Sequence, residues 1–119
     1  MTEHQIKRFH VSKRYSEMAV YAGVAYLGGQ ITNDLSLDIT GQTQDVLSQI
    51  DSLLAQAGSD KKNILRAEIF LADLCDYDSM NRVWDAWVVN GYAPPRATVQ
   101  AKLADPALKI EIIITAAVQ

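Results

Sequence analysis

The sequence lacks several features that would place it in a specialised class of protein. Its single cysteine, Cys75, excludes an internal disulfide. With no histidine nearby, we interpret Cys75 as a packed or tolerated thiol rather than a nucleophile. No apolar stretch reaches the roughly 18–20 residues of a membrane-spanning helix, and the charged residues 1–10 lack the apolar core of a signal peptide. We therefore expect a cytoplasmic protein with no membrane partner.

Positive charge and metal-binding clusters are also scarce. Eleven Lys and Arg residues stand against fourteen Asp and Glu residues, which leaves a net charge of −3, and no run of like charge is longer than two residues. Because nucleic-acid binders usually carry a basic patch, no nucleic-acid partner is expected. A small anionic ligand is compatible with this charge balance. The two histidines have no cysteine or acidic ligand set around them, so no metal site is expected.

What the sequence does contain is enough apolar material for one core. With 119 residues, 49% of them apolar, the chain has the length of one domain and buries roughly two-thirds of its unfolded surface. We expect a single domain over residues 1–119. The predicted elements are a hairpin within 18–29 turning at Ala22-Gly23, a helix from about 41 to 57, a strand over 64–71, a helix from about 76 to Gly91, and strands over 96–103 and 110–118.

This order of elements predicts an α+β fold with a mainly antiparallel or mixed sheet. Two helices can cover only one face of the sheet, yet the last strand carries apolar residues on both faces. We therefore expect a homo-oligomer in which the helix-free face packs against another subunit. The residues expected to face the core are Leu65, Ala67, Ile69 and Leu71 in the strand over 64–71, Ile110, Ile112, Ile114 and Ala116 in the strand over 110–118, and Met80, Val83, Trp84 and Trp87 in the second helix.

Two charged residues lie in predicted strands at positions where uncharged residues are more usual. Arg96 opens a strand directly after the rigid corner of Pro94 and Pro95, and Glu111 interrupts the apolar last strand. One interpretation is structural: the two form an interstrand ion pair, or Glu111 simply points outward at a sheet edge. The other is a binding site, because a guanidinium can hold a carboxylate through two parallel hydrogen bonds and a partly buried carboxylate can take part in acid–base chemistry.

Three stretches of the chain, taken together, carry a family resemblance. The strongest is PPRATVQAKLADPALKIEI, and the other two are YLGGQI and AGSDKKNILRAEIFLADLCDYDSMN. From about Tyr15 to Val118 the chain resembles the Rid (YjgF-type) family of reactive-intermediate deaminases. The resemblance implies a chorismate-mutase-like α+β fold, with a mixed sheet and two helices packed on one face. It also implies a homotrimer whose sheets face inward and whose three sites lie in clefts between subunits.

The resemblance further implies an activity and a set of site residues. Family members hydrolyse enamines and imines, such as 2-aminoacrylate and related 2-imino acids, to 2-keto acids and ammonia without a metal or organic cofactor. By position, Arg96 matches the arginine that binds the substrate carboxylate, and Glu111 matches the acid that helps to position or activate water. Tyr15 matches a tyrosine that precedes the first hairpin and closes the pocket. The ligand implied is a small imino or keto acid.

Gly28, Thr98 and Ile113, the last in place of a second acid, depart from the family pattern, and Tyr92 is open to two interpretations. Gly28 stands where many members have a serine, which removes a hydroxyl that could bind substrate. Thr98 stands where members often have a cysteine, so thiol chemistry is not expected. Tyr92, beside the proline corner, either reaches over the Arg96 site or is a plain loop aromatic.

Two other functions compete with the deaminase. Arg96 could hold a keto acid or similar carboxylate as a regulatory ligand, in which case the protein is a non-catalytic metabolite-binding module. RNA cleavage or translation inhibition, attributed to some relatives, is disfavoured because the chain is acidic and offers no basic stripe with interleaved aromatic residues.

Overall fold

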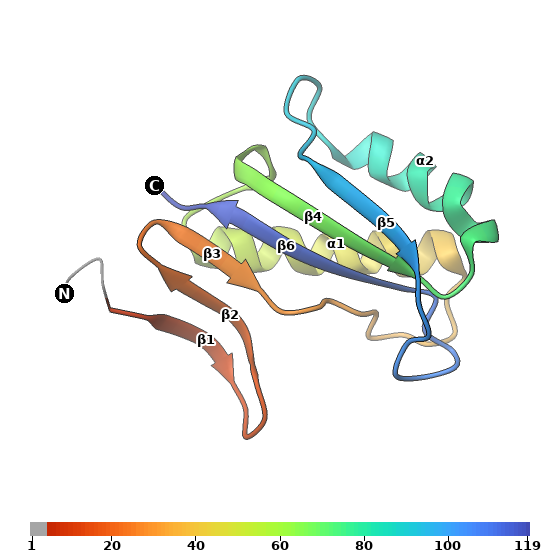
Figure 1. The fold of residues 1–119 in the computed structure, drawn as a ribbon, viewed down its shortest axis with the longest axis horizontal. Coiled ribbons are helices and arrows are strands. Elements are labelled where there is room, and N and C mark those ends of the chain that lie inside the picture. The colour runs from red at the N-terminus through yellow and green to blue at the C-terminus, as the bar shows by residue number, and fades with distance from the viewer. Residues whose placement is uncertain (1–4) are drawn as a thin grey trace.

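A computed structural model describes residues 5–119, in which two helices lie against one face of a single six-stranded sheet (Figure 1). Neither helix is long and apolar enough to cross a membrane. The strands are β1 (Lys7–Val11), β2 (Ser16–Tyr21), β3 (Val24–Leu27), β4 (Ile64–Leu71), β5 (Arg96–Gln100) and β6 (Ile110–Ala117). The helices are α1 (Ile39–Gln56) and α2 (Tyr77–Trp87), with short 3₁₀ turns η1 (Lys61–Asn63) and η2 (Leu74–Asp76).

The sheet is mixed, as the sequence predicted. Its strand order is β1-β2-β3-β6-β4-β5, and every neighbouring pair is antiparallel except β4 and β5. The parallel pair is joined by α2, which forms the crossover connection that parallel strands require. The last strand of the chain, β6, therefore lies inside the sheet between β3 and β4, while β5 forms one edge.

The core lies between the sheet and the helices. In β6, Ile110, Ile112, Ile114 and Ala116 are fully buried, which confirms the alternation expected for this strand. Trp84 is 4% exposed and belongs to this core, whereas Trp87 is only partly buried. The buried side chains of α1 that complete the core are Ile39, Val46, Leu47, Ile50, Leu53 and Leu54.

The predicted hairpin is present as β2 and β3. Its two turn residues, Ala22 and Gly23, have φ values of 50° and 79°, the left-handed backbone of the two-residue turns that match the twist of hairpin strands. The predicted end of the first helix is also confirmed, since Gly58 follows the C-cap with a φ of 76°.

The first strand of the sheet was not predicted. Residues of β1 pair with β2 in an antiparallel register that brings Phe9 opposite Met18. The sequence here is charged, and β1 is held by its backbone pairing and by Phe9, its one residue packed against the core. An edge strand with a single inward side chain shows too little periodicity to be recognised.

Three predicted details were wrong. Leu65 is 50% exposed and Ile64 is buried in its place, because a register shift between Ile64 and Arg66 inserts an extra residue opposite β6. Helix α2 ends at Trp87, before the predicted end at Gly91. Strand β5 stops at Gln100 and does not reach Leu103, because the chain leaves β4 to form the loop that leads to β6.

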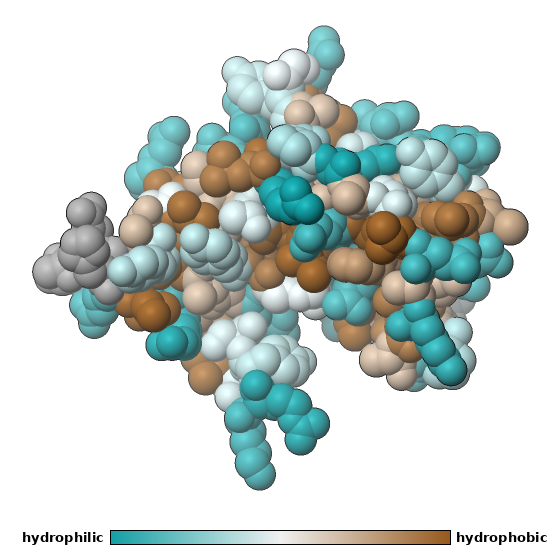
Figure 2. Space-filling view, viewed as in Figure 1, coloured by the Kyte–Doolittle hydropathy of each residue, from teal (hydrophilic) through white to brown (hydrophobic). Residues whose placement is uncertain are grey.

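The face of the sheet without helices is uncovered in the single chain. Figure 2, viewed as Figure 1 with α1 behind the strands, shows apolar and polar side chains mixed across this face. Tyr26 and Val99 are 51% and 47% exposed, and Ile113 is only partly buried. This surface is the one that the sequence predicted to pack against another subunit.

A buried glutamine ties the loop before β6 to α1. Gln42 is fully buried, and its Nε2 donates to the carbonyl oxygens of Leu37 (3.1 Å) and Ala107 (3.0 Å). Its Oε1 accepts from the backbone N–H of Lys109 at 2.9 Å. The side chain therefore satisfies backbone groups from two segments 65 or more residues apart, immediately before β6 begins.

We expect Gln42→Ala to lower the free energy of unfolding by about 2–4 kcal/mol, because the three backbone groups that Gln42 binds in this part-buried region lose their partner and an unsatisfied group costs roughly 1–3 kcal/mol. Urea denaturation followed by circular dichroism measures this change. Gln44→Ala, at an exposed position of the same helix, is the matched control and should change stability by less than about 0.5 kcal/mol. Equal effects at both positions would contradict this role for Gln42.

Candidate functional site

Arg96 is the first residue of β5, and its side chain lies on the helix-covered side of the sheet. Its guanidinium carbon lies 5.3 Å from the Trp84 ring centroid and 5.8 Å from the Tyr77 ring centroid, both on α2. Its Nη2 donates to the Tyr77 hydroxyl at 3.3 Å. Within residues 5–119 no carboxylate pairs with this half-buried guanidinium. Arg96 is thus a cation held by aromatic rings, with most of its N–H donors unused.

Thr98 follows Arg96 on the same side of β5. It pairs with the buried Ile69 of β4, as Arg96 pairs with Ala67, so both side chains of β5 face α2. Its Oγ1 and the Oδ1 of Asn81 on α2 are both buried, and neither has a hydrogen-bond partner among the described residues. The contact between α2 and β5 therefore contains polar atoms that packing alone does not require.

Glu111 lies on the opposite, helix-free side. It pairs with Phe70 of β4, and both flanking residues, Ile110 and Ile112, point into the core. Its carboxylate lies against the backbone of Gly29, where a β-carbon would overlap Oε2 and lie 2.8 Å from Cδ. The backbone conformation does not require glycine at position 29, because its φ is not positive. Glycine fits here because a β-carbon would occupy the space of the Glu111 carboxylate. This glycine sets the position of the carboxylate.

Arg96 and Glu111 do not meet within one chain. They lie on opposite faces of the sheet, and β4 separates their strands. The interstrand ion pair that the sequence allowed is therefore wrong. A site that uses both residues must take Arg96 from one subunit and Glu111 from another.

The remaining candidate residues divide between the same two regions. Gly28 and Gly29 follow β3, and the Gly28 N–H donates to the Glu17 carbonyl oxygen at 2.8 Å, which places Gly28 near the Glu111 side of the structure. Tyr15 is 62% exposed in the connection between β1 and β2, at the sheet edge opposite β5. At about 4.8 Å per strand, it lies roughly 20 Å from Arg96 of its own chain, so it can only approach an Arg96 from another subunit.

Tyr92 does not reach over Arg96 in this structure. Its ring lies 6.0 Å from the Lys62 Nζ and is 52% exposed, in the loop between α2 and β5. Two residues that do contact the candidate groups, Tyr77 and Gly29, were missed as functional residues. Tyr77 occurs seven residues before Trp84, a spacing that places both on one helix face, but only the pairing of β4 with β5 brings that face to Arg96.

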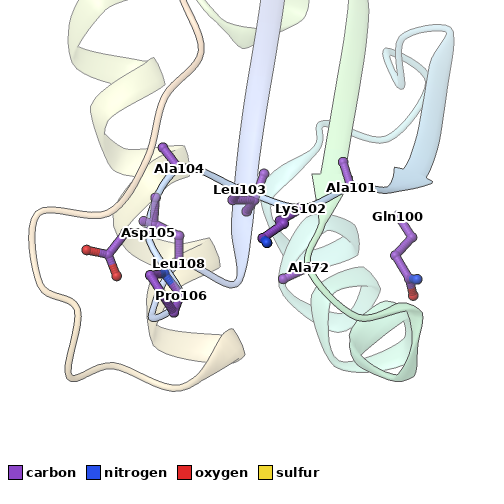
Figure 3. A pocket seen from close by; sticks show the side chains of 9 residues that line it. All are labelled: Ala72, Gln100, Ala101, Lys102, Leu103, Ala104, Asp105, Pro106 and Leu108. Atoms are coloured by element: carbon purple, nitrogen blue, oxygen red, sulfur yellow. The ribbon is translucent and has the colours of Figure 1, made fainter.

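A separate cavity of about 490 Å³ lies at the end of β5 beneath the loop that leads to β6 (Figure 3). Its walls are largely apolar, and its charged residues, Lys102 and Asp105, do not pair with each other. It lies at the end of β5 distant from Arg96, and no candidate residue lines it. The residues around it are Ala72, Gln100, Ala101, Lys102, Leu103, Ala104, Asp105, Pro106 and Leu108.

Cys75 is exposed, and the prediction of a packed thiol was wrong on that point. The Asp73 carboxylate accepts a hydrogen bond from the thiol and raises the pKa of Cys75. Since the thiolate is the nucleophile, this neighbour opposes reactivity at neutral pH. The interpretation of Cys75 as a tolerated thiol is consistent with this chemistry.

Comparison with known proteins places the chain in a family. The family model for endoribonuclease L-PSP matches residues 5–118. A RutC family protein from Haemophilus ducreyi is 51% identical over 113 residues, covering 95% of this chain and 97% of that protein. The human 2-iminobutanoate/2-iminopropanoate deaminase is more distant, at 25% identity over 104 residues, 82% of this chain and 75% of the human protein.

Solved structures agree with this placement. A YjgF-family protein from Neisseria meningitidis superposes with a TM-score of 0.96 at 44% identity, covering 99% of this chain and 98% of that one. The sheet and its two helices are therefore the chorismate-mutase-like fold predicted from the sequence. The chain belongs to the endoribonuclease L-PSP family, which is the YjgF, RutC and Rid family that its motifs indicated.

Proposed function

We propose that this protein is a cofactor-free deaminase that hydrolyses small 2-imino acids to 2-keto acids and ammonia. The observation that carries the proposal is the half-buried Arg96 guanidinium, which among residues 5–119 meets a neutral hydroxyl and two rings and no carboxylate. A partly desolvated guanidinium favours an anionic partner, and a substrate carboxylate fits its paired N–H donors. Membership of a family that includes a 2-iminobutanoate/2-iminopropanoate deaminase supports the choice of substrate.

The reaction site is proposed to lie between subunits of a homotrimer in the cytoplasm, with the sheets facing inward. Arg96 and Thr98 of one subunit bind the carboxylate of the substrate. Glu111 of the neighbouring subunit, together with Gly28 and Gly29, positions the attacking water molecule. Arg96 and Glu111 are assigned to different subunits because they lie on opposite faces of the sheet within one chain. The exposed Tyr15 closes the site from a neighbouring chain.

The chemistry needs few groups. Arg96 binds the carboxylate and fixes the imine carbon. Glu111 accepts a proton from water as the water oxygen bonds to that carbon, and it returns the proton to the nitrogen. Glu111 then moves the hydroxyl proton of the resulting carbinolamine to its nitrogen, and the carbon–nitrogen bond breaks, which releases ammonia as the carbonyl forms. Because imines hydrolyse readily in water, a barrier reduction of a few kcal/mol is sufficient, and no metal or organic cofactor is needed.

A non-catalytic carboxylate-binding regulator is the competing function. Both proposals use Arg96, so loss of binding in an Arg96 variant does not separate them. Glu111 does separate them, because a regulator would not need a group that moves protons. RNA cleavage, suggested by the family's name, gains no support from this chain's negative charge.

The first prediction concerns turnover of 2-aminoacrylate generated from serine by a dehydratase. Arg96→Ala should lower kcat/KM by about 100-fold through loss of the paired hydrogen bonds. Glu111→Gln should abolish acceleration while the Kd for pyruvate, measured by calorimetry, changes by less than about 3-fold. Arg82→Ala and Asp85→Asn, at exposed positions of α2, are the matched controls. No acceleration by folded wild type, with pyruvate still bound, would favour the regulator.

The second prediction tests the division of the site between subunits. Co-expressed Arg96→Ala and Glu111→Gln chains should regain activity, because some interfaces then combine an intact Arg96 with an intact Glu111. Random mixing in a closed trimer restores roughly a quarter of the sites. Each variant alone stays inactive, and light scattering confirms that all samples share one oligomeric state. Activity that does not return in mixed assemblies would show that the intersubunit arrangement is wrong.

The third prediction concerns the space that Gly29 leaves for Glu111. Gly29→Ala should lower kcat by about 10-fold or more, because its β-carbon displaces the carboxylate, while the Kd for pyruvate stays within about 3-fold. Gly28→Ser is the comparison for folding, since a β-carbon there lies 3.4 Å from the nearest backbone oxygen, an ordinary contact. Wild-type kcat in Gly29→Ala would contradict this role of the glycine.

A further inference from the structure

Tyr77 is the only hydrogen-bond partner of the Arg96 side chain within the described part of the chain, and burial does not explain its hydroxyl. The side chain is 42% exposed, and the ring alone would pack equally well as phenylalanine. Trp84, the other ring near the guanidinium, is 4% exposed and anchored in the core. The two rings therefore have different roles, one as a fixed wall and the other as a partner of Arg96.

Proximity to two rings does not by itself select an orientation of the guanidinium, whereas the hydrogen bond to the Tyr77 hydroxyl does. Cation–π attraction favours a guanidinium at the face of a ring but does not distinguish its N–H edges. The bond from Nη2 to the Tyr77 hydroxyl uses one identified donor and so selects one orientation. Paired binding of a carboxylate needs two parallel N–H donors on one edge, which only an oriented guanidinium presents.

The location leaves the remaining donors accessible. Strand β5 is the edge strand, so no further strand of this chain lies beyond Arg96. No acidic side chain from β4, β5 or α2 is paired with the guanidinium in residues 5–119. The edge position therefore leaves Arg96 uncovered by any further strand, where a ligand or a neighbouring subunit can approach it.

We propose that Tyr77 is a positioning residue for carboxylate binding, holding the Arg96 guanidinium in its binding orientation through the hydroxyl. The inference rests on the carboxylate-binding role of Arg96 in the proposed function. Its physical basis is pre-organisation: a guanidinium already oriented loses less side-chain freedom when the ligand binds. The effect falls on binding, since Tyr77 does not touch the reacting atoms.

Tyr77→Phe tests this proposal because it removes the acceptor and keeps the ring. We expect the Kd for pyruvate, by calorimetry, and the KM for 2-aminoacrylate to rise about 3- to 10-fold. The kcat should change by less than about 2-fold, and the Tm should not change. Tyr77→Leu, which also removes the ring, should raise the Kd further. Tyr21→Phe, a partly exposed tyrosine in the hairpin, is the matched control and should behave as wild type.

The outcomes separate this proposal from the deaminase itself. A wild type that binds pyruvate without turnover, with weaker binding in Tyr77→Phe, supports the role of Tyr77 and rejects the deaminase. An active wild type with unchanged Kd and KM in Tyr77→Phe rejects only the role of Tyr77. A fall in kcat or Tm without a change in Kd would also overturn it, since that is the signature of a structural residue. A wild type that binds no carboxylate rejects both.

Discussion

The pairing register of β4 with its two neighbours is the constraint on which the rest of the structure depends. Because side chains alternate along a strand, one register decides the face of every residue in three strands. It directs Ile110, Ile112 and Ile114 into the core and leaves Glu111 on the open face. The parallel register of β5 turns Arg96 toward α2. A slip of one residue would expose the core of β6 and bury its carboxylate.

Much of the fold was predictable because its strongest signals are local. The hairpin turn at Ala22-Gly23, the apolar stripe of α1 and the alternation of β6 each appear within a short window of sequence. The missed features depend on partners distant in sequence. Strand β1 gains its conformation by pairing with β2, and the register shift that buries Ile64 arises only against β6. Helix and strand ends were likewise decided by what the neighbouring segment packs against.

The candidate site was predictable in composition and not in arrangement. Arg96 and Glu111 stand out as charges in apolar strands, but period-two patterning does not relate the face of one strand to that of another. Contacts at Arg96 come from α2, which reaches it through the crossover between β4 and β5. The requirement for glycine at position 29 comes from a side chain 82 residues later, so only the folded chain shows it.

The separation of Arg96 and Glu111 by the thickness of the sheet has a consequence for when activity can arise. Folding of one chain orders both groups but cannot bring them to one ligand, so chemistry that needs both begins only with association. Mass action would then control the proposed activity, and dilution below the dissociation constant of the assembly would leave folded but inert chains. Substitutions on the open face of the sheet could silence the protein without touching either group. A newly made chain would therefore lack the proposed activity until it associated with other copies.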